Sequence, residues 1–366
     1  MSEETSDEAR DLARRWDALK KGDPRLRQRD AAERLGVTEG ELVASRVGRG
    51  AVRLGTDWPG ILEHLEPIGT VMALTRNGPA AIEKTGEYSG VSAKGPMGQV
   101  VDPNIDLRFF LFRWGVAYAL TEETVRGTRR SLQIYDGYGQ AVHKIFLQDD
   151  SRVEAFEQLV FSHGSDDQTA GEAFLPEPGR AAETPDAEVD RGALLTGWAA
   201  MRDTHEFVHL LRDLDITRTQ GLRLAEGIWT TPVASESYRQ VFDEIARSGA
   251  RLMVFVGNRG AIQIHGGPVE NIKRVDGWFN ILDPGFNLHL REDGVDRAWV
   301  VRKPTGDGEV TSLEIYDTAG DMIAYLFSMR EHGQQESAAW RSLLAGLPCP
   351  AVEPSGKRLA AHPRAS

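Results

Sequence analysis

The chain has 366 residues, and 40% of them are hydrophobic, which is enough for two domains or one large one with a real core. Acidic residues outnumber basic ones by 55 to 43, and the formal charge of −12 argues against sequence-nonspecific binding to nucleic acid. An anionic small ligand is compatible with this charge only if Arg and Lys cluster locally.

The N-terminal segment MSEETSDEARDLARRW is acidic and polar, and it lacks the basic start and apolar run of a signal peptide. No segment approaches the roughly 20 apolar residues that span a bilayer. Cys349 is the single cysteine, which excludes an internal disulfide or an iron–sulfur site. We therefore expect a cytoplasmic protein that is not embedded in a membrane.

Two bodies of similar length are predicted, residues 1–162 and 191–346, and each begins with helical patterns and continues with short strand-like runs. A helix over 151–162 closes the first body. Residues 163–190 are rich in Gly, Pro, Ala and acidic residues, which predicts a linker.

The second body opens with apolar residues at helical spacing over 193–214. Alternating runs such as RLMVFVGN and TSLEIYD follow, with a hairpin turn expected at 305–308 (TGDG) and a helix over 334–345. Residues 347–366 are expected to form a flexible tail. Because short, closely connected strands pair antiparallel, we predict an α+β fold with two similar halves, each a large antiparallel sheet flanked by helices.

The two bodies look like copies of one another. Residues 132–146 (LQIYDGYGQAVHKIF) and 313–327 (LEIYDTAGDMIAYLF) share six of fifteen positions at an offset of 181. Upstream, aligning Arg29 with Arg218 raises the offset to 189. We therefore expect about seven extra residues in the second copy, between positions 198 and 218.

The segment HEFVH, at 205–209, matches the zinc-protease pattern H-E-x-x-H, in which His205 and His209 would bind the metal and Glu206 would activate water. No third ligand follows at metzincin spacing, so the alternative is that Glu206 and His209 face solvent.

His205 is a separate candidate because it lies between Met201 and Val208, on the apolar side of the predicted helix. A histidine there is commonly a core residue with a hydrogen-bond partner. It falls in the segment that this alignment leaves without a counterpart, which favours a ligand added to one half only.

Basic residues form a third group of candidates. Arg108 lies within the apolar run DLRFFLF, where a charge is costly unless it is paired, and its counterpart in the second copy is His289. Arg218, Lys303 and Arg330 belong to the second copy. For each of these residues, ordinary exposure to solvent is the alternative.

Several long strings are distinctive, among them MVFVGNRG, GWFNILDPGFNLHLRE and VVRKPTGDGEVTSLEIYD, together with MRDTHEFVHLLRDLDITRTQGLRL. Over about residues 10–346 the chain resembles the cytoplasmic heme-utilisation, or hemin-degrading, proteins of bacteria (the HemS/HmuS/ChuS family). The resemblance implies a duplicated fold with one heme in a cleft between the halves.

It also implies roles for individual residues. His205, in DTHEF, would be the proximal iron ligand, and Arg108, in DLRFF, would lie on the opposite face of the heme as the catalytic group. The residues implied to hold the propionates are Arg218, Lys303 and Arg330. Two positions depart from the family pattern: Ile82 replaces a histidine, and Phe327 replaces a tyrosine expected near a propionate.

The implied function is heme binding for iron acquisition, with oxidative opening of the porphyrin and release of iron. Carriage of heme to an oxygenase or a store is the alternative, since both functions need the same pocket. A zinc peptidase built on HEFVH is the alternative from another class. Expected partners are heme, a heme importer and an electron donor, and no nucleic acid.

Overall fold

The computed structural model describes residues 3–330 and 334–350, and it divides the chain into two compact units. Each unit is built from discontinuous segments. The first unit comprises Met1–Arg76, Ile82–Pro178 and Gly257–Gln263, and the second comprises the described parts of Asn77–Ala81, Gly179–Val256 and Ile264–Ser366. Each unit thus includes a short turn from the other half of the sequence.

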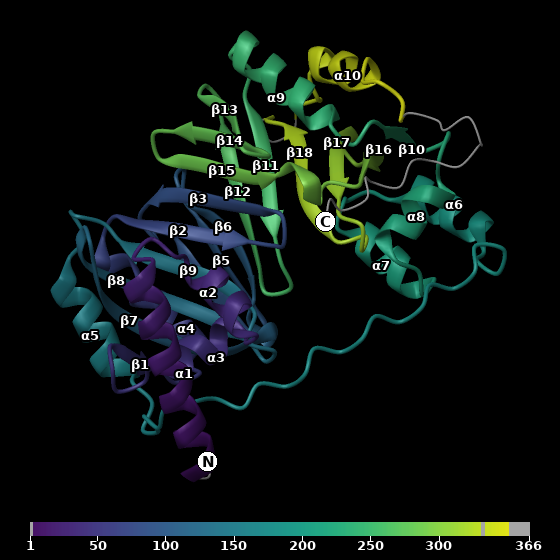
Figure 1. Cartoon of the computed structure of the whole chain (residues 1–366). Coiled ribbons are helices and arrows are strands. Elements are labelled where there is room, and N and C mark those ends of the chain that lie inside the picture. Colours follow the sequence, from purple (N-terminus) through teal and green to yellow (C-terminus); the bar gives the residue numbers. More distant parts are fainter. Residues whose placement is uncertain (1–2, 331–333, 351–366) are drawn as a thin grey trace. The chain divides into compact units, whose positions relative to one another are not determined.

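The first unit contains a large antiparallel sheet with strands in the order β1-β7-β8-β9-β2-β3, and a smaller run in the order β4-β5-β6 (Figure 1). Its described helices are α1 (Glu3–Gly22), α2 (Gln28–Leu35), α3 (Glu39–Ala44), α4 (Trp58–Glu63) and α5 (Val153–His163). Its strands are β1 (Ala51–Arg53), β2 (Val71–Arg76), β3 (Ala80–Gly86), β4 (Val91–Lys94), β5 (Met97–Val101), β6 (Asp106–Phe110), β7 (Trp114–Thr124), β8 (Gly127–Asp136) and β9 (Ala141–Leu147).

The second unit repeats this plan, with a large antiparallel sheet in the order β10-β16-β17-β18-β11-β12 and a smaller run in the order β13-β14-β15. Its described helices are α6 (Arg191–Ala200), α7 (Glu206–Asp213), α8 (Arg218–Leu224), α9 (Ser237–Ser248) and α10 (Ala338–Ala345). Its strands are β10 (Thr230–Val233), β11 (Leu252–Gly257), β12 (Ala261–Gly267), β13 (Ile272–Val275), β14 (Trp278–Asp283), β15 (Phe286–Arg291), β16 (Arg297–Thr305), β17 (Gly308–Tyr316) and β18 (Met322–Ser328).

The fold class is therefore confirmed, and the same order of helices and strands in both halves supports the predicted duplication. The hairpin turn is also confirmed, because Thr305 pairs with Gly308 where β16 meets β17. The closing helices lie close to their expected positions, as α5 and α10. Most of the predicted tail, residues 351–366, lies outside the described residues.

The predicted insertion in the second copy is wrong. Thr38 caps α3 and Thr217 caps α8, and each side chain accepts the N–H three residues later, so these two helices are equivalent. At this offset of 179, Arg218 corresponds to Glu39 rather than to Arg29, and α7 corresponds to α2. The earlier alignment matched Arg and Leu pairs that occupy unrelated positions.

The continuous helix predicted over 193–214 is also wrong, because α6 and α7 are separated by residues 201–205. Met201 leaves the helical conformation with φ −60° and ψ 142°. The Asp203 carboxylate then accepts the backbone N–H of His205 (2.7 Å), and the Glu206 carboxylate accepts that of Arg202 (2.9 Å). These local hydrogen bonds favour a turn over the intact helix.

The predicted linker has no described helix or strand between 164 and 190, yet it is bonded along much of its length. Its first part lies on the first unit, where the buried Arg53 guanidinium donates to the carbonyls of Thr169 and Gly171. Its second part lies on the second unit, where Gln220 donates to the carbonyl of Thr184 (2.5 Å).

The two exchanged turns carry equivalent asparagines. Asn77, counted with the second unit, donates from Nδ2 to the carbonyls of Met322 and Ile323 (3.1 and 2.9 Å). Asn258, counted with the first unit, donates to the carbonyls of Arg76 and Val142 (2.9 and 2.8 Å). Each turn thus supplies partners for carbonyls at the strand ends of the unit to which it belongs.

Within the described residues, no helix is both long and apolar enough to cross a bilayer.

Candidate functional site

His205 is the N-cap of α7, and its side chain is 92% exposed. The expectation that it lies on an apolar helix face is wrong, because Val208 is 60% exposed and only Met201 is buried. Its Nδ1 lies 2.6 Å from the Asp203 carboxylate, which accepts a hydrogen bond when Nδ1 carries the proton. In that tautomer Nε2 carries the lone pair. Glu206 and His209 are exposed, as one alternative predicted.

The Asp203 carboxylate is well suited to hold this tautomer. Hydrogen bonds from the backbone N–H and the ring of His205 lower the pKa of the Asp203 carboxyl below its usual value. The group is therefore ionised at neutral pH and acts as an acceptor. Asp203 was missed in the sequence because its role depends on the break between α6 and α7.

Two residues after His205, Phe207 anchors α7 to the second unit. Its ring is fully buried, and its centroid lies 4.3 Å from that of Trp198. The Arg218 guanidinium carbon lies 4.9 Å from the Phe207 centroid, and Lys303 Nζ lies 5.1 Å from it. Phe207 thus connects the segment of His205 to two of the predicted basic residues. The helices α6, α7 and α8 lie close together in the second unit (Figure 1).

These basic residues belong to a buried polar network that we name the Glu314 cluster: Arg218, Lys303, Ser312, Glu314, Tyr316 and Tyr325. Arg218 donates to both Glu314 oxygens, with Nη2–Oε1 at 2.8 Å and Nε–Oε2 at 3.0 Å. Lys303 Nζ donates to Oε1 at 2.6 Å, and the Tyr316 hydroxyl donates to Oε2 at 2.5 Å. One carboxylate therefore joins two cations on a buried sheet face.

Burial and charge oppose each other in this cluster. Burial alone would raise the pKa of the Glu314 carboxyl, but Arg218 and Lys303 outweigh it and hold that pKa below its ordinary value. Burial lowers the pKa of the Lys303 ammonium to about 8, although Glu314 opposes the shift. At neutral pH the three groups together carry one net positive charge. Glu314 was missed in the sequence because it lies in the strand-like run SLEIYD, with no motif around it.

The two remaining candidates of the second unit lie on or just after β18. Phe327 shares a strand face with Tyr325, and its ring centroid is 5.1 Å from that of Phe255. Arg330 follows the end of β18, and its Nη1 is buried without a hydrogen-bond partner in the part of the chain that the structure describes. A buried guanidinium N–H without an acceptor is unusual and leaves a donor open to a further group.

Arg108 and Ile82 belong to the first unit. Arg108 lies on the half-exposed face of β6 and is paired with Asp106, so its charge is satisfied as the sequence required. Its counterpart His289 lies on β15, with Nδ1 2.7 Å from Asn280 Oδ1. Ile82 is fully buried on β3, so the position that often holds a histidine in the family is a core position here.

The first unit contains a second buried network that sequence reasoning did not find, which we name the Glu39 cluster: Gln28, Glu39, Arg76, Tyr135 and Lys144. Glu39 pairs with both Arg76 and Lys144, and Gln28 Nε2 donates to the Tyr135 hydroxyl at 2.8 Å. Glu39 lies on a helix, whereas its two cations lie on strands. The sequence signal was the capped motif TEGE, whose first acid faces the sheet.

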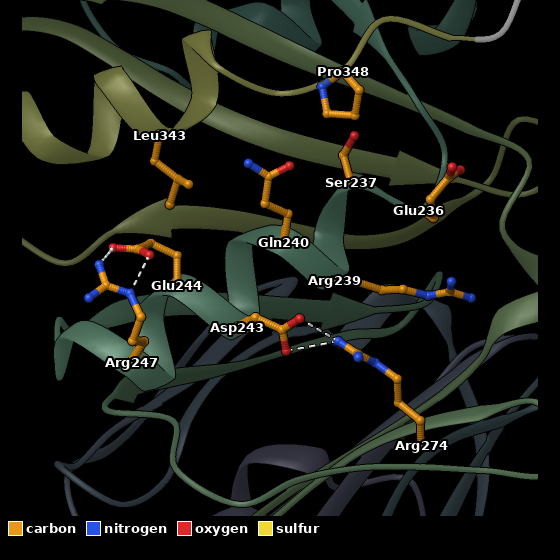
Figure 2. Close-up of a pocket in the computed structure, with 10 residues that line it drawn as sticks. All are labelled: Glu236, Ser237, Arg239, Gln240, Asp243, Glu244, Arg247, Arg274, Leu343 and Pro348. Carbon is orange, nitrogen blue, oxygen red and sulfur yellow. Dashed lines mark hydrogen bonds and ion pairs between the residues drawn. The ribbon is translucent and has the colours of Figure 1, made fainter.

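A pocket of about 500 Å³ lies beside α9, and none of the predicted site residues lines it (Figure 2). Two of its guanidinium groups are already paired, Arg247 with Glu244 and Arg274 with Asp243. The six charged residues that line it are balanced between acid and base. This pocket therefore does not mark the predicted heme site.

Comparison with known proteins identifies the family. The model of the haemin-degrading HemS.ChuX domain matches twice, over residues 36–163 and 215–347. The hemin transport protein HmuS of Yersinia pestis is 36% identical over 320 residues, which cover 87% of this chain and 92% of that protein. The double match starts at equivalent positions of the two halves, which agrees with the offset given by the helix caps.

Solved structures agree. The holo form of PhuS, a heme-binding protein from Pseudomonas aeruginosa, is 47% identical, with a TM-score of 0.91, covering 93% of this chain and 99% of that chain. The heme-degrading enzyme ChuS of Escherichia coli O157:H7 is 34% identical, with a TM-score of 0.86 and the same coverage. The resemblance seen in the sequence, and heme as its cofactor, are therefore confirmed at the level of the family. This chain belongs to the haemin-degrading HemS.ChuX family.

Proposed function

We propose that this chain is a cytoplasmic heme-binding protein for heme-iron acquisition and that it holds one heme through His205. The observation that carries the proposal is the pair formed by His205 and Asp203, at 2.6 Å. A histidine that ligates a metal commonly donates its other ring N–H to a carboxylate, which fixes the tautomer and raises the basicity of the free nitrogen. The exposed Nε2 is then the donor to iron.

The propionates are proposed to bind to Arg218, Lys303 and Arg330. Arg330 offers a buried donor without a partner, and the Glu314 cluster carries a net positive charge. Arg218 and Lys303 already donate hydrogen bonds to Glu314, so their N–H groups would be divided between this carboxylate and a propionate. Phe327 is proposed to contribute apolar contact at the edge of the porphyrin.

Bound heme would supply an iron centre at which the porphyrin can be opened oxidatively, given an electron donor. Arg108 is proposed to face the heme as the catalytic group. Its guanidinium holds a fixed positive charge and several N–H donors, but it cannot release a proton near neutral pH. Proton delivery would therefore pass through water held by the protein.

Carriage of heme from an importer to an oxygenase or a store is the alternative function, and it uses the same binding residues. A zinc peptidase lacks comparable support. His205 precedes α7 instead of lying within it, and no group of three metal-ligating side chains occurs among the described residues.

Hemin titration tests the binding proposal. We expect saturation at one hemin per chain, and we expect His205→Ala to shift the Soret band and weaken binding on the order of 100-fold, about 2.7 kcal/mol. His209→Ala and Glu206→Gln serve as neighbours on the same helix and should leave the band unchanged. Equal loss in both histidine variants, without unfolding, would overturn the assignment of His205 and revive the zinc site.

The same complex separates degradation from carriage. After ascorbate and oxygen are added, loss of the Soret band with a bile-pigment product indicates an enzyme, whereas a stable complex indicates a carrier. Asp203→Asn tests the orientation of the ligand. We expect it to weaken iron ligation by roughly 10–100-fold while hemin stoichiometry is kept. An unchanged affinity and spectrum in this variant would show that Asp203 does not support the ligand.

A further inference from the structure

Two histidines of the first unit meet at the ends of two helices. His64 is the C-cap of α4, and His163 is the last residue of α5. His163 Nε2 lies 3.2 Å from His64 Nδ1, and the ring centroids are 4.8 Å apart. His64 is exposed and His163 is half-buried, so the pair is accessible from solvent. Neither histidine has a role in the proposed heme function.

Hydrogen bonds fix the backbone of His163 and the ring of His64. The carbonyl of His163 accepts the N–H of Gly55 at 2.8 Å, and His64 Nδ1 lies 2.8 Å from the carbonyl of Gly60. Gly60 also provides the space that the rings need. A Cβ at that position would lie 2.2 Å from Asp57 Oδ2 and 2.9 Å from His163 Cε1.

The surroundings favour a cation. The negative end of a helix dipole faces each histidine, because both stand at helix C-termini. The Asp57 carboxylate adds a full negative charge close to the His163 ring. Burial, with a smaller contribution from His64, lowers the pKa of the His163 imidazole, so this ring is neutral at pH 7 and can offer a lone pair.

We propose that His64 and His163 form a chelating site for a late first-row divalent metal ion. With metal–nitrogen bonds of about 2.05 Å, nitrogens 3.2 Å apart subtend an angle of about 100° at the metal, which is close to tetrahedral. Neutral imidazoles suit Zn²⁺, Ni²⁺ and Cu²⁺, with affinity rising from Ni²⁺ to Cu²⁺.

Binding requires a change of tautomer at His64. In the free protein Nδ1 donates to the Gly60 carbonyl, so the ring proton must move to Nε2 through solvent before Nδ1 can donate its lone pair to a metal. The freed carbonyl can then accept a hydrogen bond from a metal-bound water. Water would complete the coordination, since the described residues contain no converging group of three His, Cys, Asp or Glu side chains.

The second unit provides an internal contrast. The buried positions of α4 and α9 match at an offset of 180, with Ile61 at Val241 and Leu65 at Ile245, so His64 corresponds to Glu244. His163 corresponds to Pro348, because the carbonyls of these two residues accept the N–H groups of Gly55 and Ala234. The second unit therefore has no imidazole at either equivalent position, and the pair is confined to the first unit.

Calorimetric titration of the full, heme-free chain with Ni²⁺ at pH 7.5 tests the site. We expect one Ni²⁺ per chain, with affinity at least tenfold weaker in His64→Gln and in His163→Gln. His209→Ala is the control, because it removes another exposed histidine and should leave the affinity unchanged. Circular dichroism verifies that each variant is folded.

A second measurement does not depend on variants. Paramagnetic Ni²⁺ should broaden the ring-proton resonances of His64 and His163 first, and acidification to pH 5.5 should release the metal. The proposal is overturned if Ni²⁺ does not bind, if binding follows His209 instead, or if both glutamine variants bind like the parent chain.

Discussion

The Glu39 and Glu314 clusters occupy equivalent places in the two units, yet their charges are arranged in opposite ways. After its threonine cap, α3 presents Glu39 to two cations on strands, Arg76 and Lys144. At the same position α8 presents Arg218 to an acid on a strand, Glu314, which also holds Lys303. Each cluster contains one carboxylate and two basic side chains.

The comparison shows that the helix residue of a duplicated core can change from acid to base when the acid moves to a strand, so that the buried groups remain paired. Reversing one charge alone would leave a buried ion without a partner, which typically destabilises a protein by about 3–5 kcal/mol. The units also differ where the preceding helix starts, because the N-cap of α2 is Arg27 and that of α7 is His205. At this helix start the second unit therefore presents an exposed imidazole, where the first unit has an arginine.

The largest expected effect comes from the central acid of each cluster. Glu314→Gln and Glu39→Gln should each lower the free energy of unfolding by about 3–5 kcal/mol, because two buried cations lose their counter-ion. Thermal denaturation measures the loss, and hydrogen exchange of peptides from β17 or α3 assigns it to one unit. A change below 1 kcal/mol in both variants would contradict the ion-pair account of the clusters.

The cationic residues distinguish the units in heme binding. Alanine at Arg218, Lys303 or Arg330 should weaken hemin binding by about 1–3 kcal/mol, the range for hydrogen bonds to charged groups, with little change in the iron spectrum. Arg76→Ala is the matched control from the Glu39 cluster and should leave hemin affinity unchanged. If all three alanine variants bind like the parent chain, the propionate assignment is wrong.

The units should also differ in their response to acid at one pair of equivalent strand positions, where the first unit has the fully buried His143. His143 is held between the Tyr88 hydroxyl (2.5 Å) and Thr75 Oγ1 (2.8 Å), and burial lowers the pKa of its imidazole to about 3. In the unfolded chain this pKa is about 6.5, so the unfolded state takes up the proton first as the pH falls. The corresponding residue of the second unit is Ala324.

His143 should therefore destabilise the first unit by about 1.4 kcal/mol for each pH unit below pH 6.5, until the pH reaches the folded-state pKa of about 3. Glu314 acts in a lower window, because its depressed pKa stabilises the second unit until the pH falls below about 4.3. Hydrogen exchange of β9 and β18 peptides at pH 6.5 and 5.0, corrected for intrinsic rates, measures the difference. Equal loss in both peptides would show that His143 is not its source.

The smallest effect concerns the threonine caps that define the alignment of the copies. Thr38→Ala and Thr217→Ala should each destabilise their unit by about 1 kcal/mol. The two losses should be similar, because each hydroxyl also donates to a carboxylate, Thr38 to Glu41 and Thr217 to Glu183. Melting temperatures compare the two variants, and an unaffected Thr217→Ala would weaken the equivalence of α3 and α8.

Much of the fold was predictable because its signals are local. Alternation identified the strands, TGDG identified a hairpin, and a constant offset identified the duplication. The alignment failed before the first strands, where the copies differ in length: Trp16 precedes Glu39 by 23 residues, but Trp198 precedes Arg218 by 20. Short helices joined by variable turns offer few fixed points, and the caps became recognisable only from their hydrogen bonds.

The site was less predictable because its chemistry depends on partners distant in sequence. Arg218 and Lys303 were singled out by resemblance, but their pairing with Glu314 follows from how α8 packs on the sheet. The environment of His205 was predicted wrongly, since an unbroken helix would have turned it toward Met201. The break at residues 201–205 instead leaves the imidazole in solvent.

The turn that contains Asn258 affects how the protein is made. The first unit includes Gly257–Gln263, whereas the rest of it ends at Pro178. Ribosomes add about 5–20 residues per second, so roughly 4–17 seconds separate these two segments during synthesis. Until then the carbonyls of Arg76 and Val142 lack the Asn258 side chain. The N-terminal unit of a nascent chain must therefore remain incomplete while Gly179–Val256 of its C-terminal neighbour is translated.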